Sequence, residues 1–372
     1  MSQVASGSCL RLLTLEGRAV REPVGPSERS SLPIWRMTLM KHSLNRMSTY
    51  ELRSPRPIRS RVAAGALAIL AGSVVLAGFG VTNPAGAATK KAFPVTIKTG
   101  ATSVTIKKKP VRIVSLSPTA TEMLFAIGAG KQVKAADDYS NFPANAPKTK
   151  LSGFKPNAEA IAAYKPDLVV VSADGDAMKA LRALKIPVMV LPAAEKITDS
   201  YAQIEQLGAA TGHIADAVKV SSTMQSEIAA IIASVPKRTA PLRYFHELDN
   251  TLYSVTSKTF VGQLYSMLGM TNVADAADKE GFGYPQLSAE YLVSSDPDVI
   301  LLADTKCCAQ DAAAVAKRAG FSGLTAVKNG QIIALDDDVA SRWGPRIVDL
   351  LRVLAKETAS LKGTATPVGV GA

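Results

Sequence analysis

The sequence predicts an α/β protein of two lobes with mainly parallel sheets, joined by one long helix. Three observations predict this class. Short apolar runs alternate with helix-periodic stretches from about Val111 onward, one helix–turn–strand unit occurs twice, and a long helical pattern lies between the two copies. Strands that alternate with helices form parallel sheets covered on both faces. The 372 residues are enough for one or two ordinary domains.

Seven short segments have the composition of buried strands. They are rich in Val, Ile and Leu, and most are bounded by Pro, Gly or Asp. The predicted strands are Arg112–Leu116, Asp167–Ala173, Val188–Leu191, Arg243–Glu247, Leu252–Thr256, Val299–Ala303 and Gln331–Leu335. Ala-rich stretches with helical periodicity lie between several of them, which favours helices on both faces of each sheet.

One sequence unit occurs twice, about 130 residues apart. Residues 158–171 read AEAIAAYKPDLVVV, and residues 289–302 read AEYLVSSDPDVILL. Each copy begins with Ala-Glu, has Pro-Asp seven residues after the Glu, and continues as an apolar strand. This spacing is too long for a solenoid repeat. It indicates two lobes of similar fold.

A long helix is predicted between the two copies. From Gly212 to Val235 the apolar residues recur on a seven-residue stripe, and Pro236 ends the pattern. A helix of this length acts as a stiff strut rather than as a hinge loop. The predicted organisation is an N-terminal lobe at 111–211, a connecting helix at 212–236, a C-terminal lobe at 240–361 and a flexible tail at 363–372.

Residues 1–87 form a predicted leader that carries much of the positive charge. They hold 11 of the 43 Lys and Arg but 4 of the 31 Asp and Glu, which leaves a net charge of +5 for the remainder. The formal charge of +12 therefore does not indicate a nucleic-acid-binding face. Four Arg precede a charge-free apolar core at 62–81 and then Ala85-Gly86-Ala87, the pattern of a cleaved secretory signal.

The leader leaves alternatives open. A retained membrane anchor is one, because about 18–20 apolar residues can span a bilayer, and a membrane-tethered interaction protein that uses the basic leader is another. Met47 lies where a start codon would give a signal of ordinary length, so residues 1–46 need not be translated. Phe79 stands where a lipobox would need Cys. We expect an exported, extracytoplasmic protein, either cleaved or tethered by an uncleaved N-terminal helix.

Cysteine and histidine spacings argue against a metal site. Cys307 and Cys308 are the two cysteines beyond the leader, and neither they nor His213 and His246 have a zinc-ligand spacing. The adjacent cysteines form either a vicinal disulfide in an oxidising compartment or a pair of small apolar residues after a strand. His246 is expected to be buried and hydrogen-bonded rather than a ligand of haem iron.

Several segments, in order, resemble those of one known family. They are RIVSLSPTATEMLFAIGAG at 112–130, DDYSNFP at 137–143, KPDLVVV at 165–171, YPQLSAE at 284–290, DPDVILLAD at 296–304 and SRWGPRIVDLL at 341–351. Together they look like the helical-backbone (class III) periplasmic binding proteins of ABC importers, which serve cobalamin, ferric siderophores and haem. The cobalamin-binding branch is closest. The resemblance covers about Val111 to Leu361.

The resemblance implies two Rossmann-like lobes joined by a long helix, with the ligand held in the cleft between them. It implies a solute-binding protein that captures a corrinoid or a ferric-siderophore chelate, has no intrinsic cofactor, and delivers the chelate to the transmembrane subunits of an ABC importer. A haem-binding protein of the same fold is an alternative. We expect a monomer that binds no nucleic acid.

Two glutamates match the family's transporter-docking positions. Glu159 and Glu290 stand at the same place in the two copies of the repeated unit. The resemblance implies that each pairs with an arginine of the importer, and two symmetric rim charges suit a two-fold permease. A simpler explanation also exists, since an acidic residue at a helix N-terminus stabilises the helix dipole.

Three loop aromatics match family positions that present rings to the ligand. They are Tyr139, Phe154 and Tyr284. Such rings pack well against large flat macrocycles, because each aromatic side chain buries on the order of 150–250 Å² when enclosed. Packing in the core is the alternative for each of them.

The remaining predicted ligand contacts are Ser117, Pro118, Arg342 and Trp343. Ser117 and Pro118 open a helix whose backbone N–H groups point at the predicted cleft, and helix capping is their alternative role. The resemblance implies that Arg342 reaches the ligand, while Trp343 either stacks on the ligand or packs under the loop. Glu122 is expected to be a cap or a buried partner.

The acidic run at 336–338 is expected to be a solvated loop with one capping role. The cobalamin branch has an aromatic residue near Val339, and this departure leaves the ligand open. No catalytic residues are expected, because the chain lacks G-x-S-x-G, H-E-x-x-H and a dinucleotide fingerprint. A tetrapyrrole chelatase is the enzyme alternative, for which His246 beside Glu247 is the one hint.

Overall fold

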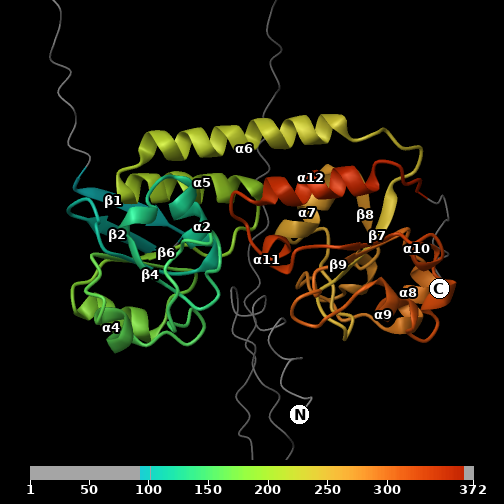
Figure 1. Ribbon diagram of the computed structural model, residues 1–372, viewed down its shortest axis with the longest axis horizontal. Coiled ribbons are helices and arrows are strands. Elements are labelled where there is room, and N and C mark those ends of the chain that lie inside the picture. Colours follow the sequence, from blue (N-terminus) through green and yellow to red (C-terminus); the bar gives the residue numbers. More distant parts are fainter. Residues whose placement is uncertain (1–92, 101, 364–372) are drawn as a thin grey trace, which may run out of the picture. The chain divides into compact units, whose positions relative to one another are not determined.

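Two parallel four-stranded sheets, each flanked by helices, form two lobes (Figure 1). This computed structural model describes residues 93–100 and 102–363. The predicted leader, with its signal core at 62–81, and the predicted tail beyond Gly363 lie outside the described residues. No helix within the described ranges has the length and apolar character that a membrane crossing requires. The predicted fold class is confirmed.

The N-terminal lobe contains the sheet β4-β3-β5-β6, in which all neighbouring strands are parallel. Its strands are β3 (Ile113–Leu116), β4 (Val133–Ala136), β5 (Leu168–Val171) and β6 (Val188–Val190). Its helices are α2 (Pro118–Ala126), α3 (Ala158–Ala162), α4 (Asp176–Ala183) and α5 (Ile197–Thr211), with a 3₁₀ turn η1 (Gly130–Gln132). An antiparallel hairpin of β1 (Val95–Thr99) and β2 (Thr102–Ile106) precedes this sheet.

The C-terminal lobe contains the sheet β10-β9-β7-β8, which is also parallel throughout. Its strands are β7 (Leu242–Glu247), β8 (Met270–Asn272), β9 (Val299–Leu302) and β10 (Ile332–Ala334). Its helices are α7 (Phe260–Met267), α8 (Ala289–Ser295), α9 (Ala312–Ala316), α10 (Thr325–Lys328), α11 (Asp337–Ala340) and α12 (Ile347–Thr358). Two 3₁₀ turns, η2 (Asp275–Ala277) and η3 (Phe321–Gly323), complete the lobe.

Helix α6 (Ile214–Ser234) connects the lobes over 21 residues and covers most of the predicted connecting helix. It packs against α5 of the first lobe and α12 of the second (Figure 1). Gly212 lets the chain reverse between α5 and α6, because its φ of 74° is left-handed and favours glycine. A helix seated on both lobes is a rigid link between them.

The repeated sequence unit folds in the same way in both lobes. Asp167 accepts the backbone N–H of Arg112 at 2.9 Å, and Asp298 accepts the backbone N–H of Arg243 at 2.8 Å. The guanidinium groups of Arg112 and Arg243 donate to carbonyl groups just beyond α3 and α8, respectively. In each lobe the Asp of the Pro-Asp pair therefore hydrogen-bonds to the start of the neighbouring parallel strand, which gives the repeated Pro-Asp a structural role in both lobes.

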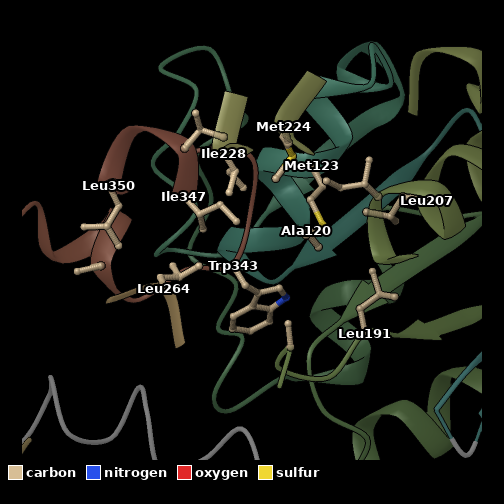
Figure 2. Close-up of a cluster of buried hydrophobic side chains, with 14 of the residues drawn as sticks. Ala120, Met123, Leu191, Leu207, Met224, Ile228, Leu264, Trp343, Ile347 and Leu350 are labelled. Atoms are coloured by element: carbon tan, nitrogen blue, oxygen red, sulfur yellow. The ribbon is translucent and has the colours of Figure 1, made fainter. Parts of the chain in front are cut away.

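The largest hydrophobic cluster is shared by both lobes and α6. Figure 2 shows side chains of α2, α5, α6, α7 and α12 meeting around Trp343; those labelled include Met123, Leu207, Met224, Leu264 and Ile347. Two smaller clusters lie within the single lobes. The described residues therefore belong to one compact unit that contains both sheets.

Six of the seven predicted strands correspond to strands of the structure, and Leu252–Thr256 does not. Leu252 has a left-handed φ of 69°, and the segment bonds to the loop at 283–287 instead of joining a sheet. That prediction was wrong, because β-rich composition cannot distinguish a strand from an extended loop. Strands β1, β2, β4 and β8 were not predicted.

Candidate functional site

The two predicted docking glutamates lie at equivalent, exposed positions. Glu159 is the second residue of α3, which Asn157 caps, and Glu290 is the second residue of α8, which Ser288 caps. Hydrogen bonds from its own backbone N–H and from Ser288 lower the pKa of Glu290. Among the described residues neither carboxylate has an ion-pair partner. Both acids are therefore available to a cationic partner.

Two of the three predicted ligand aromatics lie side by side. Tyr139, in the loop after β4, and Phe154, in the loop before α3, pack edge to face with ring centroids 5.7 Å apart. Tyr139 is 40% exposed. Tyr284 is half-buried in the second lobe, in the loop whose carbonyl groups accept hydrogen bonds from Ser254 and Thr256. Tyr284 therefore belongs to the second lobe, whereas the Tyr139–Phe154 pair belongs to the first.

Ser117 and Pro118 lie where β3 ends and α2 begins, as predicted. The Ser117 hydroxyl accepts the backbone N–H of Ala120 at 3.3 Å, and Pro118 occupies the first turn. This is the capping role that the sequence left as the alternative. Ser117 is buried, so a ligand contact by its side chain stays a prediction.

Arg342 is buried between the lobes, with 8% of its surface exposed. Its Nη1 donates to Glu122 Oε1 at 2.7 Å. Its Nη2 donates to Asp338 Oδ1 at 2.7 Å and to the carbonyl oxygen of Tyr139 at 3.1 Å. Glu122 is thus a buried partner, as expected. The guanidinium contacts protein groups of both lobes, and its predicted contact with a ligand stays a prediction.

Arg346 takes part in the same network and was missed by the sequence reasoning. Its Nε donates to Glu122 Oε2 at 3.0 Å, and its guanidinium lies 4.2 Å from the ring centroid of Phe142. A cavity of about 250 Å³ lies beside this contact, lined by Glu122, Phe125, Ala126, Phe142, Pro143, Pro345 and Arg346. The sequence feature that could have identified Arg346 is its place in the SRWGPR segment, four residues after Arg342.

Trp343 packs under its loop rather than into an open cleft. It is 6% exposed, and its Nε1 donates to Gln203 Oε1 at 2.8 Å. Ser200 donates to its carbonyl oxygen. The ring lies within the hydrophobic cluster shared by the lobes (Figure 2). Packing under the loop is one of the two alternatives that the sequence left open, and a contact of Trp343 with a ligand stays a prediction.

The acidic run at 336–338 is more ordered than a solvated loop. Asp336 caps α11, as expected, while Asp337 accepts three backbone N–H groups from residues 305–307. Asp338 accepts from Arg342, Lys306 and Asn141. Burial raises the pKa of Asp338, but Arg342, Lys306 and the hydrogen bond from Asn141 together outweigh burial and lower the pKa overall. Asp338 therefore remains ionised within the interlobe network.

The adjacent cysteines after β9 are half-buried, and the sulfur atoms of Cys307 and Cys308 lie 2.9 Å apart. The vicinal disulfide and the pair of small residues both stay predictions. Among the described residues no cluster of His, Cys, Asp and Glu has the arrangement of a metal site.

A chelatase would need a histidine and a carboxylate that face an open cleft, whereas His246 and Glu247 are both buried. His246 is fully buried, its Nδ1 lies 2.7 Å from Tyr265 Oη, and burial lowers its pKa to about 3. Glu247 is equally buried and accepts two hydrogen bonds of 2.6 Å from Arg318. His246 is therefore the buried, hydrogen-bonded residue that the sequence predicted.

A comparison with known protein families decides the class of this fold. Residues 113–339, more than half of the chain, match the family described as periplasmic binding protein. The chain belongs to the periplasmic binding protein family. This confirms the resemblance found in the sequence, and it places the protein in a family of binding proteins.

This periplasmic binding protein is similar in sequence to several known proteins and in fold to solved structures. An uncharacterized ABC transporter substrate-binding lipoprotein of Bacillus subtilis is 33% identical over 306 residues, 78% of this chain and 94% of that protein. A cobalamin-binding protein of Halobacterium salinarum is 29% identical over 274 residues, 71% of this chain and 73% of that protein. The crystal structure of a possible iron-binding (periplasmic solute-binding) protein from Staphylococcus epidermidis matches with a TM-score of 0.59 and 27% identity, over 67% of this chain and 99% of that chain.

Proposed function

We propose that this periplasmic binding protein works outside the cytoplasm, where it captures a corrinoid or a ferric-siderophore chelate and delivers it to an ABC importer. The observation that carries the proposal is the pair of unpaired, exposed acids, Glu159 and Glu290, at the same position of a unit built once into each lobe. Relatives named as ABC transporter substrate-binding and cobalamin-binding proteins support both parts of it.

The docking role follows from charge and symmetry. Each glutamate lies in the first turn of a short helix, where a negative charge also interacts favourably with the helix dipole. Exposed charges of this kind steer encounter and fix register more than they add affinity. Two such acids on similar lobes match two arginine-bearing subunits of an importer.

The ligand class is supported by two rings of the first lobe, the exposed Tyr139 and the half-buried Phe154. Tyr139 and Phe154 already pack edge to face, and Tyr139 leaves 40% of its surface open. A corrin ring or the aliphatic shell of a ferric siderophore can cover such a pair. Haem is the alternative, and the fully buried His246 offers no exposed ligand for its iron.

An uptake measurement tests the proposal. Cells that lack this chain should lose import of radiolabelled cyanocobalamin or of a ferric hydroxamate, and the wild-type gene should restore it. Unchanged uptake of both chelates, with the chain absent, would contradict the proposal. N-terminal sequencing of the exported protein separates a cleaved leader from a tether.

A further inference from the structure

Glu122 lies on α2 of the first lobe, but its carboxylate binds two arginines of the second. Arg342 Nη1 donates to Oε1 at 2.7 Å, and Arg346 Nε donates to Oε2 at 3.0 Å. Only 1% of the Glu122 side chain is exposed. Removing one partner of a buried ion pair leaves an uncompensated charge and is strongly unfavourable. Glu122 therefore joins the two lobes at a defined point.

The contact between α2 and the SRWGPR segment is close. A Cβ atom placed on Gly344 would lie 3.3 Å from Glu122 Oε2 and 3.7 Å from its Cβ. Arg346 also lies over the ring of Phe142, which belongs to the loop after β4. The segment is thus seated against both α2 and that loop, so a shift of either changes the position of Arg342.

Arg342 extends this connection to the loop that carries Tyr139. Its Nη2 donates to the Tyr139 carbonyl oxygen at 3.1 Å and to Asp338 at 2.7 Å. Asp338 in turn accepts from Asn141 of the same loop at 3.0 Å. A planar guanidinium held by three acceptors has little orientational freedom. The loop at 137–143 is therefore held at two points by the second lobe.

We propose that Glu122 is a positioning residue for ligand binding: it orients Arg342, which fixes the Tyr139 loop and so presents the Tyr139–Phe154 ring pair to the chelate. The inference rests on the proposed function, because it requires that this ring pair contacts the chelate. Both carboxylate oxygens of Glu122 are taken up by the two arginines. Its effect passes through Arg342.

Hydrogen exchange and binding, measured on the same variants, test the proposal. Glu122→Gln should raise amide exchange at 137–143 and at 338–346 together. It should weaken binding of cyanocobalamin, or of the ferric hydroxamate if the wild-type protein binds that instead, by about tenfold, as expected for residues that act through another residue. Arg342→Lys keeps the charge but cannot reach Glu122 and Tyr139 at once, so it should reproduce both effects if Glu122→Gln fails to fold.

A matched control and a double variant separate positioning from general destabilisation. Glu247→Gln removes another buried carboxylate bound by an arginine, Arg318, but within one lobe. It should leave exchange at 137–143 and the affinity unchanged. Glu122→Gln with Arg342→Lys should weaken binding no more than the worse single variant.

Two results would overturn the proposal: unchanged exchange at 137–143 in Glu122→Gln, or increased exchange there with unchanged affinity. A wild-type protein that binds neither chelate would instead contradict the proposed function. In that case exchange alone decides whether Glu122 orders the loop.

Discussion

Glu159 and Glu290 occupy the same position in two copies of one helix–turn–strand unit, each as the second residue of a capped helix. The copies lie in separate sheets, so each lobe presents one exposed acid. In the proposed docking role, the internal repeat would supply one acid to each half of a two-fold importer. It is also the feature that mutation can test most cleanly, because neither side chain supports the core.

The double variant Glu159→Ala/Glu290→Ala should abolish uptake while the affinity for the chelate changes by less than about twofold, since rim charges act on docking rather than on the ligand. Uptake of labelled cyanocobalamin in cells and calorimetry on the purified protein measure the two effects. Glu357→Ala, at another exposed acid, should leave uptake intact. A large loss of affinity in the double variant would refute the docking assignment.

Arg318→Met should lower the free energy of unfolding by about 3–5 kcal/mol, because it leaves the buried Glu247 carboxylate without its cation. Urea unfolding followed by circular dichroism measures this change. Arg352→Met removes an exposed arginine paired with Glu227, and the expected loss is below about 1 kcal/mol. Equal losses in the two variants would mean that burial of the Glu247–Arg318 pair does not matter.

The titration of Asp304 should lower the free energy of unfolding as the pH rises. Burial, and then the neighbouring Glu247, raise the pKa of Asp304 from 3.8 to about 8. Between these values the folded protein holds a proton that the unfolded chain has released. The stabilisation is therefore full below about pH 4 and is lost as the pH rises through 8.

Asp304→Asn removes this titration, so unfolding measured from pH 4 to 8 should show the wild-type advantage shrinking, by at most about 1.4 kcal/mol per pH unit. The exposed Asp176→Asn variant should show no such trend. A constant difference between wild type and Asp304→Asn across this range would rule out the raised pKa.

Trp343 should be shielded from solvent in the folded protein. A Trp35→Phe variant leaves Trp343 as the one tryptophan. Because its ring lies in the shared core and its Nε1 is bonded to Gln203, iodide should quench its fluorescence weakly until urea unfolds the chain. Quenching close to that of free tryptophan in the folded state would place the ring in an open cleft.

The sequence predicted the parts of the fold that depend on local pattern. Buried parallel strands such as β5 and β9 are continuous apolar runs, and α6 has an unbroken helical stripe ended by Pro236. Strands β4 and β8 are short and of mixed composition, so no local signal distinguishes them. The extended segment at 252–256 has strand composition but bonds to a loop.

The interlobe network could not be predicted in the same way. Glu122 and Arg342 are 220 residues apart, and nothing in either segment specifies that they meet. The family resemblance assigned Arg342 to the ligand, whereas the structure engages it with Glu122, Asp338 and the Tyr139 carbonyl. Trp343 was ambiguous because an aromatic beside a ligand loop has the same local sequence whether it faces the cleft or the core.

Equilibrium dialysis of the exported protein against cyanocobalamin, a ferric hydroxamate and haemin tests the central claim most directly. The account predicts saturable binding of cyanocobalamin or of the ferric hydroxamate, with one chelate per chain. Absence of binding to both, with the protein shown to be folded by circular dichroism, would contradict it.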